Sequence, residues 1–246
     1  MRRRFFVDRF DERRAVLSGD AAHHAARVLR AAPGQMYELS DGRSVWLAQV
    51  TAARRDAVEF TLVEPVVAGP APFPMALLLA IVKFDRFEWA LEKATELGVA
   101  EITPLAAARS EKALVAAAAK RASRWQKILT EAAQQSRQLR APVLHSATRS
   151  AEAFRSAAGA SERGSAALLF FSEFAGAPPL RSVLQNHPTA RRAVIAIGPE
   201  GGWTEEERSS ALDCGFAEAG LGPTILRTET AVAAALAAVS FALTTP

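Results

Sequence analysis

Two stretches of the 246-residue sequence place glycine and proline beside hydroxyl and charged residues, in a pattern that could hold a ligand. The first, IGPEGGWTEEE, covers residues 197–207 and follows an apolar run. Glycines there let backbone approach a ligand closely, because no Cβ stands in the way. The stretch lacks the signatures of a P-loop and of a dinucleotide-binding loop. With Glu200 in the turn and three glutamates after it, we expect a neutral or cationic ligand rather than a phosphate.

The same stretch also has a purely structural interpretation. Thr204 and Glu207 have the spacing of a capping box, in which a hydroxyl and a carboxylate satisfy the first free amides of a helix. A tight, capped connection would explain the turn without any ligand. The second stretch, LGPTILRTETAVAAAL over residues 221–236, repeats the form with a Gly-Pro turn, Arg227 and a Thr-Glu-Thr helix start. Two such turns could lie side by side.

Alternating strand and helix patterns precede these turns. Patterns of buried strands cover residues 75–82, 101–105, 166–171 and 193–197, and helical patterns cover residues 85–98 and about 118–138. This alternation predicts an α/β domain with a mostly parallel sheet. The first glycine turn follows the strand at 193–197, at the carboxyl end where open α/β sheets bind ligands.

The N-terminal part has a different pattern, made mostly of short strands. Strand patterns cover residues 3–7, 35–39, 44–50 and 57–64, and one helical segment, GDAAHHAARVLR, covers residues 19–30. Turn signals lie at Pro33-Gly34 and Asp41-Gly42, so we expect a small β-barrel. A Pro- and Gly-rich stretch at 68–74 looks like a linker. We therefore predict domains at residues 1–70 and 71–246.

Composition favours a cytoplasmic protein and is compatible with nucleic-acid binding. The one cysteine, Cys214, excludes an intramolecular disulfide framework, and the N-terminus has no apolar signal segment. The net charge is +4, and arginine supplies 25 of the 30 basic residues. Residues 1–30 hold eight arginines against four acids, so the basic excess is N-terminal. Arginine pairs with phosphate and stacks on bases, although a solvated arginine-rich surface gives the same composition.

Several motifs together resemble one family. GPEGGWTEEE and LGPTILRTETA, preceded by KFDRFEWALEKATELGV, ITPL and EAAQQS, are similar to those of the bacterial 16S ribosomal RNA uridine N3-methyltransferases of the SPOUT superfamily. The N-terminal RFFV and HHAARVLRAAPGQ also match, so the resemblance covers nearly the whole chain. It implies an N-terminal PUA-like RNA-binding barrel and a C-terminal SPOUT α/β domain with a parallel sheet and a trefoil knot. It also implies a homodimer that acts on 16S rRNA in the small ribosomal subunit.

The resemblance implies S-adenosyl-L-methionine as the methyl donor. Its site needs apolar walls and backbone groups, and the two glycine turns could supply both. The residues that the resemblance assigns to the cofactor are Leu169, Phe170, Phe171, Ile197, Gly198, Pro199, Glu200, Gly201, Gly202, Leu221, Gly222, Ile225, Leu226, Arg227, Thr230 and Ala231. Glu200 could instead stabilise its own loop, and Trp203 could line the same pocket.

Methylation of uracil N3 requires loss of its proton and a cationic group near the uracil oxygens. The cationic candidates are Arg86, Arg109 and Arg227, each of which could instead be a helix-terminal or phosphate-binding arginine. Glu200 and Glu229 are the candidates for the general base. The sequence does not decide between them.

Candidate RNA-binding residues lie mostly in the predicted barrel. His24, Arg27 and Arg30 would form one polar stripe on a helix, with Val28 and Leu29 facing inward, unless the stripe is only a solvated face. Other candidates are Arg2, Arg3, Arg4, Lys83 and Arg86. We expect no metal site, because His23 and His24 diverge on a helix and no acidic or cysteine cluster joins them, and no membrane span, because the longest apolar run is too short.

The chain departs from the family at one position. In the family the EAAQQS helix continues to a Gly-Arg or Arg-Arg pair, and this sequence has Gln138 at the arginine position, so either Arg137 or Arg140 substitutes for that arginine or the contact is absent. Two alternative functions stay open. One is methylation of another rRNA or tRNA nucleotide on the same fold, and the other is a non-catalytic RNA-binding assembly factor.

Overall fold

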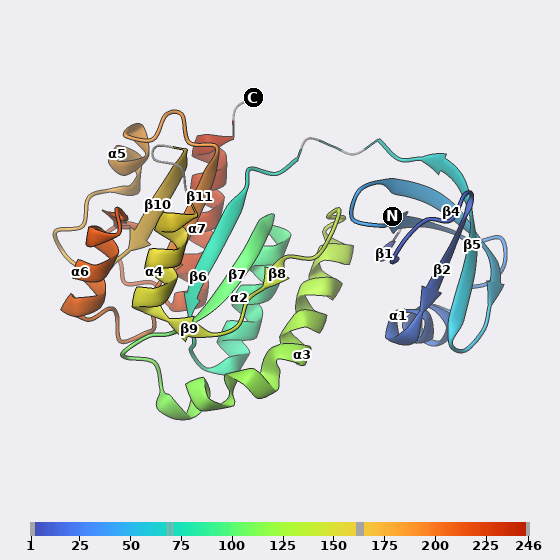
Figure 1. The fold of residues 1–246 in the computed structure, drawn as a ribbon, viewed down its shortest axis with the longest axis horizontal. Helices are drawn as coiled ribbons and strands as arrows, with labels where there is room; N and C mark the ends of the chain where they lie inside the picture. The colour runs from blue at the N-terminus through green and yellow to red at the C-terminus, as the bar shows by residue number, and fades with distance from the viewer. Residues whose placement is uncertain (1–2, 68, 70, 161–164, 245–246) are drawn as a thin grey trace. The chain divides into compact units, whose positions relative to one another are not determined.

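The structure is a computed structural model that describes residues 3–67, 69, 71–160 and 165–244. The chain forms two compact units, which differ clearly in architecture (Figure 1). The first unit comprises Met1–Ala71 and Thr130–Ala141, and the second comprises Pro72–Leu129 and Pro142–Pro246. Among the described residues, no helix is long and apolar enough to cross a membrane.

The first unit contains a curled sheet of five strands in the order β1-β3-β4-β5-β2. The strands are β1 Arg4–Phe6, β2 Arg14–Ser18, β3 Met36–Ser40, β4 Val45–Ala53 and β5 Ala57–Pro65. Strands β1 and β3 are parallel, and the other neighbours are antiparallel. Phe5, Leu17, Leu39 and Phe60 are buried together as its core. Sequence patterns predicted every strand except β2, whose short apolar alternation is flanked by charged residues.

The helical segment at 19–30 differs from its prediction. It is an α-helix, α1 Gly19–His23, continued by a π-helical turn, η1 His24–Val28. Because a π turn has more residues than an α turn, the face that meets the core changes along the segment. Ala22 and Ala25 are buried, whereas Val28 is 64% exposed. The expectation that Val28 faces inward was wrong.

The second unit is built on a parallel sheet with the strand order β12-β10-β11-β6-β7-β8, and β9 also pairs with β7. The strands are β6 Met75–Ala80, β7 Val99–Ala106, β8 Val143–Leu144, β9 Thr148–Arg149, β10 Ala166–Phe171, β11 Arg192–Ile197 and β12 Ala217–Ala219. Every residue of β10 is buried, as expected of a strand covered on both faces. Strands β8 and β9 were not predicted, because two residues are too few to show a period.

Helices cover both faces of this sheet (Figure 1). They are α2 Phe84–Glu96, α3 Lys112–Gln135, α4 Ser150–Gly159, α5 Leu180–Gln185, α6 Glu205–Asp213 and α7 Thr228–Leu243. On one face, Phe87 of α2 packs against Trp125 of α3 with ring centroids 4.6 Å apart. On the other face, Phe154 of α4 packs against Phe170 and Phe216. These two apolar layers hold the carboxyl ends of β10, β11 and β6 at one edge.

Candidate cofactor and catalytic site

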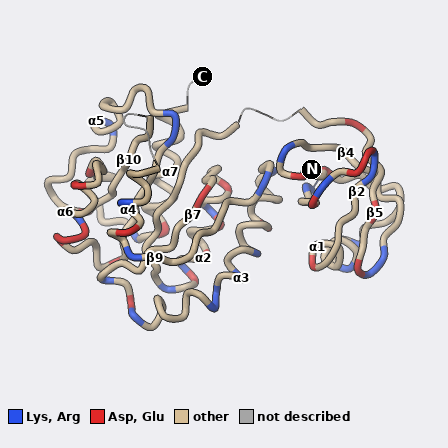
Figure 2. Tube along the Cα trace, viewed as in Figure 1, with Lys and Arg blue, Asp and Glu red and all other residues tan. Residues whose placement is uncertain are grey.

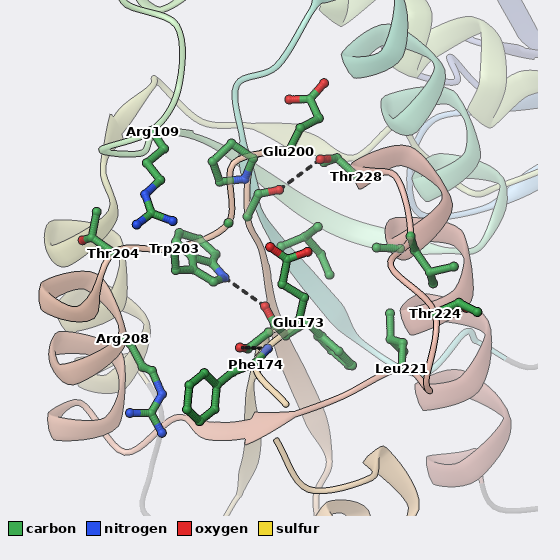
Figure 3. A pocket seen from close by; sticks show the side chains of 18 of the residues that line it. Arg109, Glu173, Phe174, Glu200, Trp203, Thr204, Arg208, Leu221, Thr224 and Thr228 are labelled. Atoms are coloured by element: carbon green, nitrogen blue, oxygen red, sulfur yellow. Dashed lines mark hydrogen bonds between the residues drawn. The ribbon is translucent and has the colours of Figure 1, made fainter. Parts of the chain in front are cut away.

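A pocket of about 280 Å³ opens at the carboxyl ends of β10 and β11 (Figure 3). The parallel register brings Phe171, the last residue of β10, beside Ile197, the last residue of β11. The two glycine turns start near this edge, and the Thr228 hydroxyl of the second donates to the Gly198 carbonyl of the first at 3.2 Å. The expectation that the two turns lie side by side is therefore confirmed.

Helix α6 holds the first turn in place. The Thr204 hydroxyl accepts from the Glu207 amide, and the Glu207 carboxylate accepts from the Thr204 amide, so the predicted capping box is present. Glu207 is buried, and its other oxygen also accepts from the Ala108 amide at 3.0 Å and the Ser150 hydroxyl at 2.8 Å. One carboxylate thus ties the turn to the loop after β7 and to the start of α4.

Trp203 forms one wall of the pocket and explains why position 198 is glycine. Its indole nitrogen donates to the Phe171 carbonyl at 2.9 Å, and its ring packs on Phe170 with centroids 4.8 Å apart. A Cβ on Gly198 would lie 2.9 Å from Cε2 of this indole, closer than carbon atoms normally approach. The glycine turn predicted a close approach of the backbone to a ligand. At Gly198 the backbone instead closely approaches the Trp203 side chain of the protein itself.

Arg208 of α6 organises another part of the lining, on the same side as Trp203 (Figure 3). It donates to both oxygens of Glu218 at 2.7–3.0 Å, pairs with Glu205 at 3.1 Å, and lies 5.2 Å from the centroid of the Phe174 ring. Hydrogen bonds from Arg208 hold the pKa of Glu218 below its usual value, although burial opposes this. The same hydrogen bonds raise the pKa of Arg208. This ion pair fixes α6 to β12 beside the pocket.

Three of the five catalytic candidates form one cluster. Arg86 pairs with Glu200 at 2.8 Å, and its Nε lies 4.0 Å from Glu229 Oε1. The other carboxylate oxygen of Glu229 is buried and has no hydrogen-bond partner in the part of the chain that the structure describes. A buried acceptor without a donor lowers the stability of the folded state. A ligand that donates a hydrogen bond to Glu229 Oε2 would remove this free-energy penalty.

The other two candidates lie apart from this cluster. Arg109 lines the pocket and donates to the Gly201 carbonyl at 2.7 Å, which braces the first turn. Arg227 is exposed at the N-cap of α7.

Most of the predicted cofactor residues line the pocket: Phe171, Ile197, Gly198, Pro199, Glu200, Gly202, Leu221, Gly222, Leu226 and Ala231. Leu169 and Phe170 lie inside the sheet, because only the last residue of β10 reaches its edge. Gly201, Ile225, Arg227 and Thr230 are exposed and lie outside the lining.

Sequence reasoning did not assign several lining residues: Ser172, Glu173, Phe174, Thr204, Glu205, Arg208, Thr224 and Thr228. Ser172, Glu173 and Phe174 directly follow the β10 strand, so the rule that ligands bind beyond carboxyl ends could have found them. Arg208 carries no such signal, since its place depends on pairing with Glu218 of another element. Trp203, an open candidate, does line the pocket.

The candidate RNA-binding residues differ in their exposure and in their contacts. Arg27, Arg30 and Lys83 are exposed, Arg86 is in the cluster, and Arg3 lies 3.4 Å from His24. Arg2 lies outside the described residues. Arg4 was wrongly assigned, because its side chain is buried in an ion pair with Glu38 at 2.9 Å and cannot present its charge to RNA.

Arg4 also contacts the segment around Gln138, where the sequence departs from the family. Its Nη1 donates to the carbonyl oxygens of Arg137 and Gln138. Arg137 has a positive φ of 58°, and its own Nη1 lies 3.9 Å from Glu38. The backbone of this segment is therefore held by Arg4 within the first unit. In the described residues, no group of three side chains is placed to bind a metal ion.

Comparison with known proteins identifies the family. Residues 69–240 match the RNA methyltransferase domain, and residues 17–63 match the RNA methyltransferase PUA domain. Ribosomal RNA small subunit methyltransferase E of Synechocystis sp. is 33% identical over 220 residues, which cover 89% of this chain and 70% of that protein. The protein of the same name in Mycobacterium bovis is 31% identical over 239 residues, covering 96% and 90%.

A solved structure gives the same answer. Ribosomal RNA small subunit methyltransferase E from Neisseria gonorrhoeae, bound to S-adenosyl methionine, superposes with a TM-score of 0.84 at 29% identity, covering 98% of each chain. The predicted α/β fold class, with a PUA-like N-terminal domain and a parallel SPOUT-type C-terminal sheet, is confirmed, and the part predicted as a β-barrel is a curled sheet of five strands. The chain belongs to the RNA methyltransferase family that includes the ribosomal RNA small subunit methyltransferases E.

Proposed function

We propose that the protein transfers a methyl group from S-adenosyl-L-methionine to N3 of a specific uridine in the decoding region of 16S rRNA, in the assembled small subunit. The family and the names of the relatives support methylation of small-subunit rRNA. The N3 position follows from the resemblance of the sequence motifs. The observation that carries the proposal is the pocket between the two glycine turns, in a chain that superposes on a relative with S-adenosyl methionine bound.

The pocket suits this cofactor. Ile197, Leu221 and Leu226 provide apolar surface for the adenine, and the backbone groups of the two turns can read its polar edge. Glu173 lines the pocket and forms no ion pair within the described residues, so its negative charge favours a cationic ligand. The bound cofactor supplies a methyl group on a positively charged sulfur.

The cluster of Arg86, Glu200 and Glu229 performs the proton and charge chemistry in this proposal. Arg86 stabilises negative charge on the uracil oxygens as N3 loses its proton. Glu229 accepts that proton through its buried, unpartnered Oε2, while Glu200 holds Arg86 in place at 2.8 Å. Two observations support this choice of base: Glu200 Oε1 already accepts from Arg86 at 2.8 Å, and Glu229 Oε2 has no partner within the described residues.

We further propose that the protein is a cytoplasmic homodimer whose second unit contains the trefoil knot of its family. A groove of about 940 Å³ lies along α5 and α7 and is lined mostly by apolar residues, among them Leu180, Leu184 and Ala238. Phe241, in the same lining, is 90% exposed. A second copy would cover this surface. In the same proposal, residues 1–70 bind RNA and residues 71–246 bind the cofactor.

The decisive experiment is methyl transfer from labelled S-adenosyl-L-methionine to small-subunit particles that lack the modification. Reverse transcription should stop at one uridine of the decoding region, because a methyl group at N3 blocks base pairing, and nucleoside mass spectrometry should identify 3-methyluridine. A different methylated nucleoside would replace the N3 assignment. Cofactor binding without transfer to particles, rRNA or tRNA would favour the non-catalytic alternative.

A further inference from the structure

We propose that the solvent-facing side of helix α3 is a second RNA-binding surface, which contacts the rRNA backbone beside the active site. This inference rests on the proposed function, since it takes the same rRNA as the partner. It adds to the basic residues of the first unit a set of residues that no motif singled out. The surface consists of Ala113, Ala116, Lys120, Ser123, Arg124 and Lys127, all of which are exposed.

The spacing of these residues places them on one face. Lys120, Arg124 and Lys127 are four and three residues apart, so their side chains lie above one another on successive turns. The opposite side of the helix is in the core, where Ala118, Trp125 and Leu129 are buried. The exposed face is therefore fixed in orientation by the packing of its apolar side.

The charge of this face is only partly compensated. Arg121 and Arg124 share the single carboxylate of Glu88, at 3.6 and 2.8 Å. Within the described residues, Lys120 and Lys127 form no ion pair. The four basic residues between positions 120 and 127 are therefore balanced by one carboxylate, that of Glu88. The first acid further along this face of the helix is Glu131.

Other surface helices of the second unit are not charged in this way. Helix α2 carries four acids against Arg86 and Lys93, and α6 carries four acids against Arg208 (Figure 2). Lys93 in particular is neutralised, since it pairs with Glu92 at 2.7 Å and Glu96 at 2.8 Å. The basic excess on α3 is local and does not follow from the mild net charge of the chain.

The surface continues toward the active site. Helix α3 begins at Lys112, three residues after Arg109, which lines the cofactor pocket. Between Lys112 and Lys120 the face carries only Ala113 and Ala116, whose small side chains let a phosphate chain lie close to the helix. With a rise of 1.5 Å per residue, the face from Lys112 to Lys127 is about 22 Å long. An RNA strand whose target base enters the active site could lie along this face of α3.

The chemistry favours RNA over a lipid surface. A helix that lies on a membrane presents large apolar side chains toward the acyl chains. The large apolar residues of α3, such as Trp125 and Leu129, are instead buried in the protein, and the free face holds alanine, serine and basic residues. Phosphates of a single RNA strand match this combination.

The test measures binding of the full-length protein to unmethylated small-subunit particles between about 50 and 200 mM KCl at constant Mg²⁺. The variants are Lys120→Ala, Lys127→Ala and the double variant, and the matched control is Lys93→Ala, which removes a lysine whose charge is already paired. Alanine preserves the helix, because it has the highest helix propensity. Each of Lys120→Ala and Lys127→Ala should reduce the slope of log K against log salt by about one, and the double variant by about two. At 150 mM salt the double variant should bind on the order of tenfold more weakly.

S-adenosyl-L-methionine affinity, measured by calorimetry, should be unchanged in every variant. If the wild-type protein binds and methylates the particles while the double variant keeps the wild-type salt slope, the α3 surface is not an RNA site and only this inference fails. Failure of the wild-type protein to bind the particles at all would instead reject the proposed function. An unchanged slope together with loss of binding to phosphatidylglycerol vesicles would assign the surface to a membrane and overturn the proposal.

Discussion

Gly198→Ala should destabilise the second unit, because the new Cβ would lie 2.9 Å from Cε2 and 3.0 Å from Nε1 of Trp203. The indole has little freedom to move away, since it donates to the Phe171 carbonyl and packs against both Phe154 and Phe170. Carbon atoms in contact are normally about 3.5–4.0 Å apart, so the ring must recede by roughly 0.5–1 Å. Overpacking of this kind costs about 1–3 kcal/mol.

That cost corresponds to a decrease in Tm of roughly 2–12 °C for a protein of this size. Because Trp203 also lines the pocket, the displaced ring should raise the Kd for S-adenosyl-L-methionine on the order of tenfold, the equivalent of about 1.4 kcal/mol. The measurements are differential scanning calorimetry and isothermal titration calorimetry on the same preparations.

Gly201→Ala is the matched control in the same turn. Its Cβ would lie 3.4 Å from Arg109 Cβ and 3.5 Å from Arg109 Cδ, at the short end of ordinary van der Waals contact, so little has to move. We expect a change within about 0.5 kcal/mol. In a Trp203→Leu background, which lacks Cε2 and Nε1, the effect of Gly198→Ala should largely disappear. Equal Tm and Kd values for wild type and Gly198→Ala would refute the claim that packing against Trp203 requires glycine at this position.

Three further predictions concern the active site, pH and the dimer. Glu229→Gln should lower kcat by about 10²–10⁴-fold if Glu229 accepts the N3 proton, with S-adenosyl-L-methionine affinity unchanged. Near-normal kcat would remove Glu229 as the base, and Glu64→Gln, at an exposed position of β5 outside the pocket, is the control. Glu218→Gln should cost about 1.5–3 kcal/mol at pH 7, because Glu218 loses its charged hydrogen bonds with Arg208. The pKa of Glu218 is lowered in the folded state, so its contribution is complete above the unfolded value of about 4.3 and is lost as pH falls through the folded value. The Tm difference from wild type should therefore shrink in acid, and a constant difference from pH 7 to 3 would contradict this. Phe241→Glu should convert the proposed dimer to monomers in sedimentation analysis, whereas a wild-type protein that is already monomeric would disprove the dimer.

Local patterns predicted the parts of the fold that depend on local chemistry. The spacing of Thr204 and Glu207 gave the capping box, and the buried run at 193–197 gave the strand before it. The Phe87 face of the predicted helix is the one that packs on the sheet. These features succeed because period and capping are set by residues three or four positions apart.

Features that depend on distant partners were not predictable in this way. Arg208 and Glu218 meet only once α6 lies beside β12, and Arg86 meets Glu200 only once the α2 and β11 segments are neighbours. Arg4 resembled the rest of the basic N-terminal arm, but Glu38 lies opposite it in the β1–β3 register. Val28 was misplaced because a π turn gives no sign in the hydrophobic pattern.

The contact of Arg4 with the carbonyl groups of Arg137 and Gln138 has a consequence for how the protein is made. These partners are separated by 133 and 134 positions along the chain. A ribosome delivers the N-terminal strands first, so they emerge long before the segment that accepts from Arg4. The sheet can form early, but its buried guanidinium lacks two of its acceptors until more than half of the chain has been synthesised. The first unit is therefore completed only after residues 72–129 of the second unit have been translated.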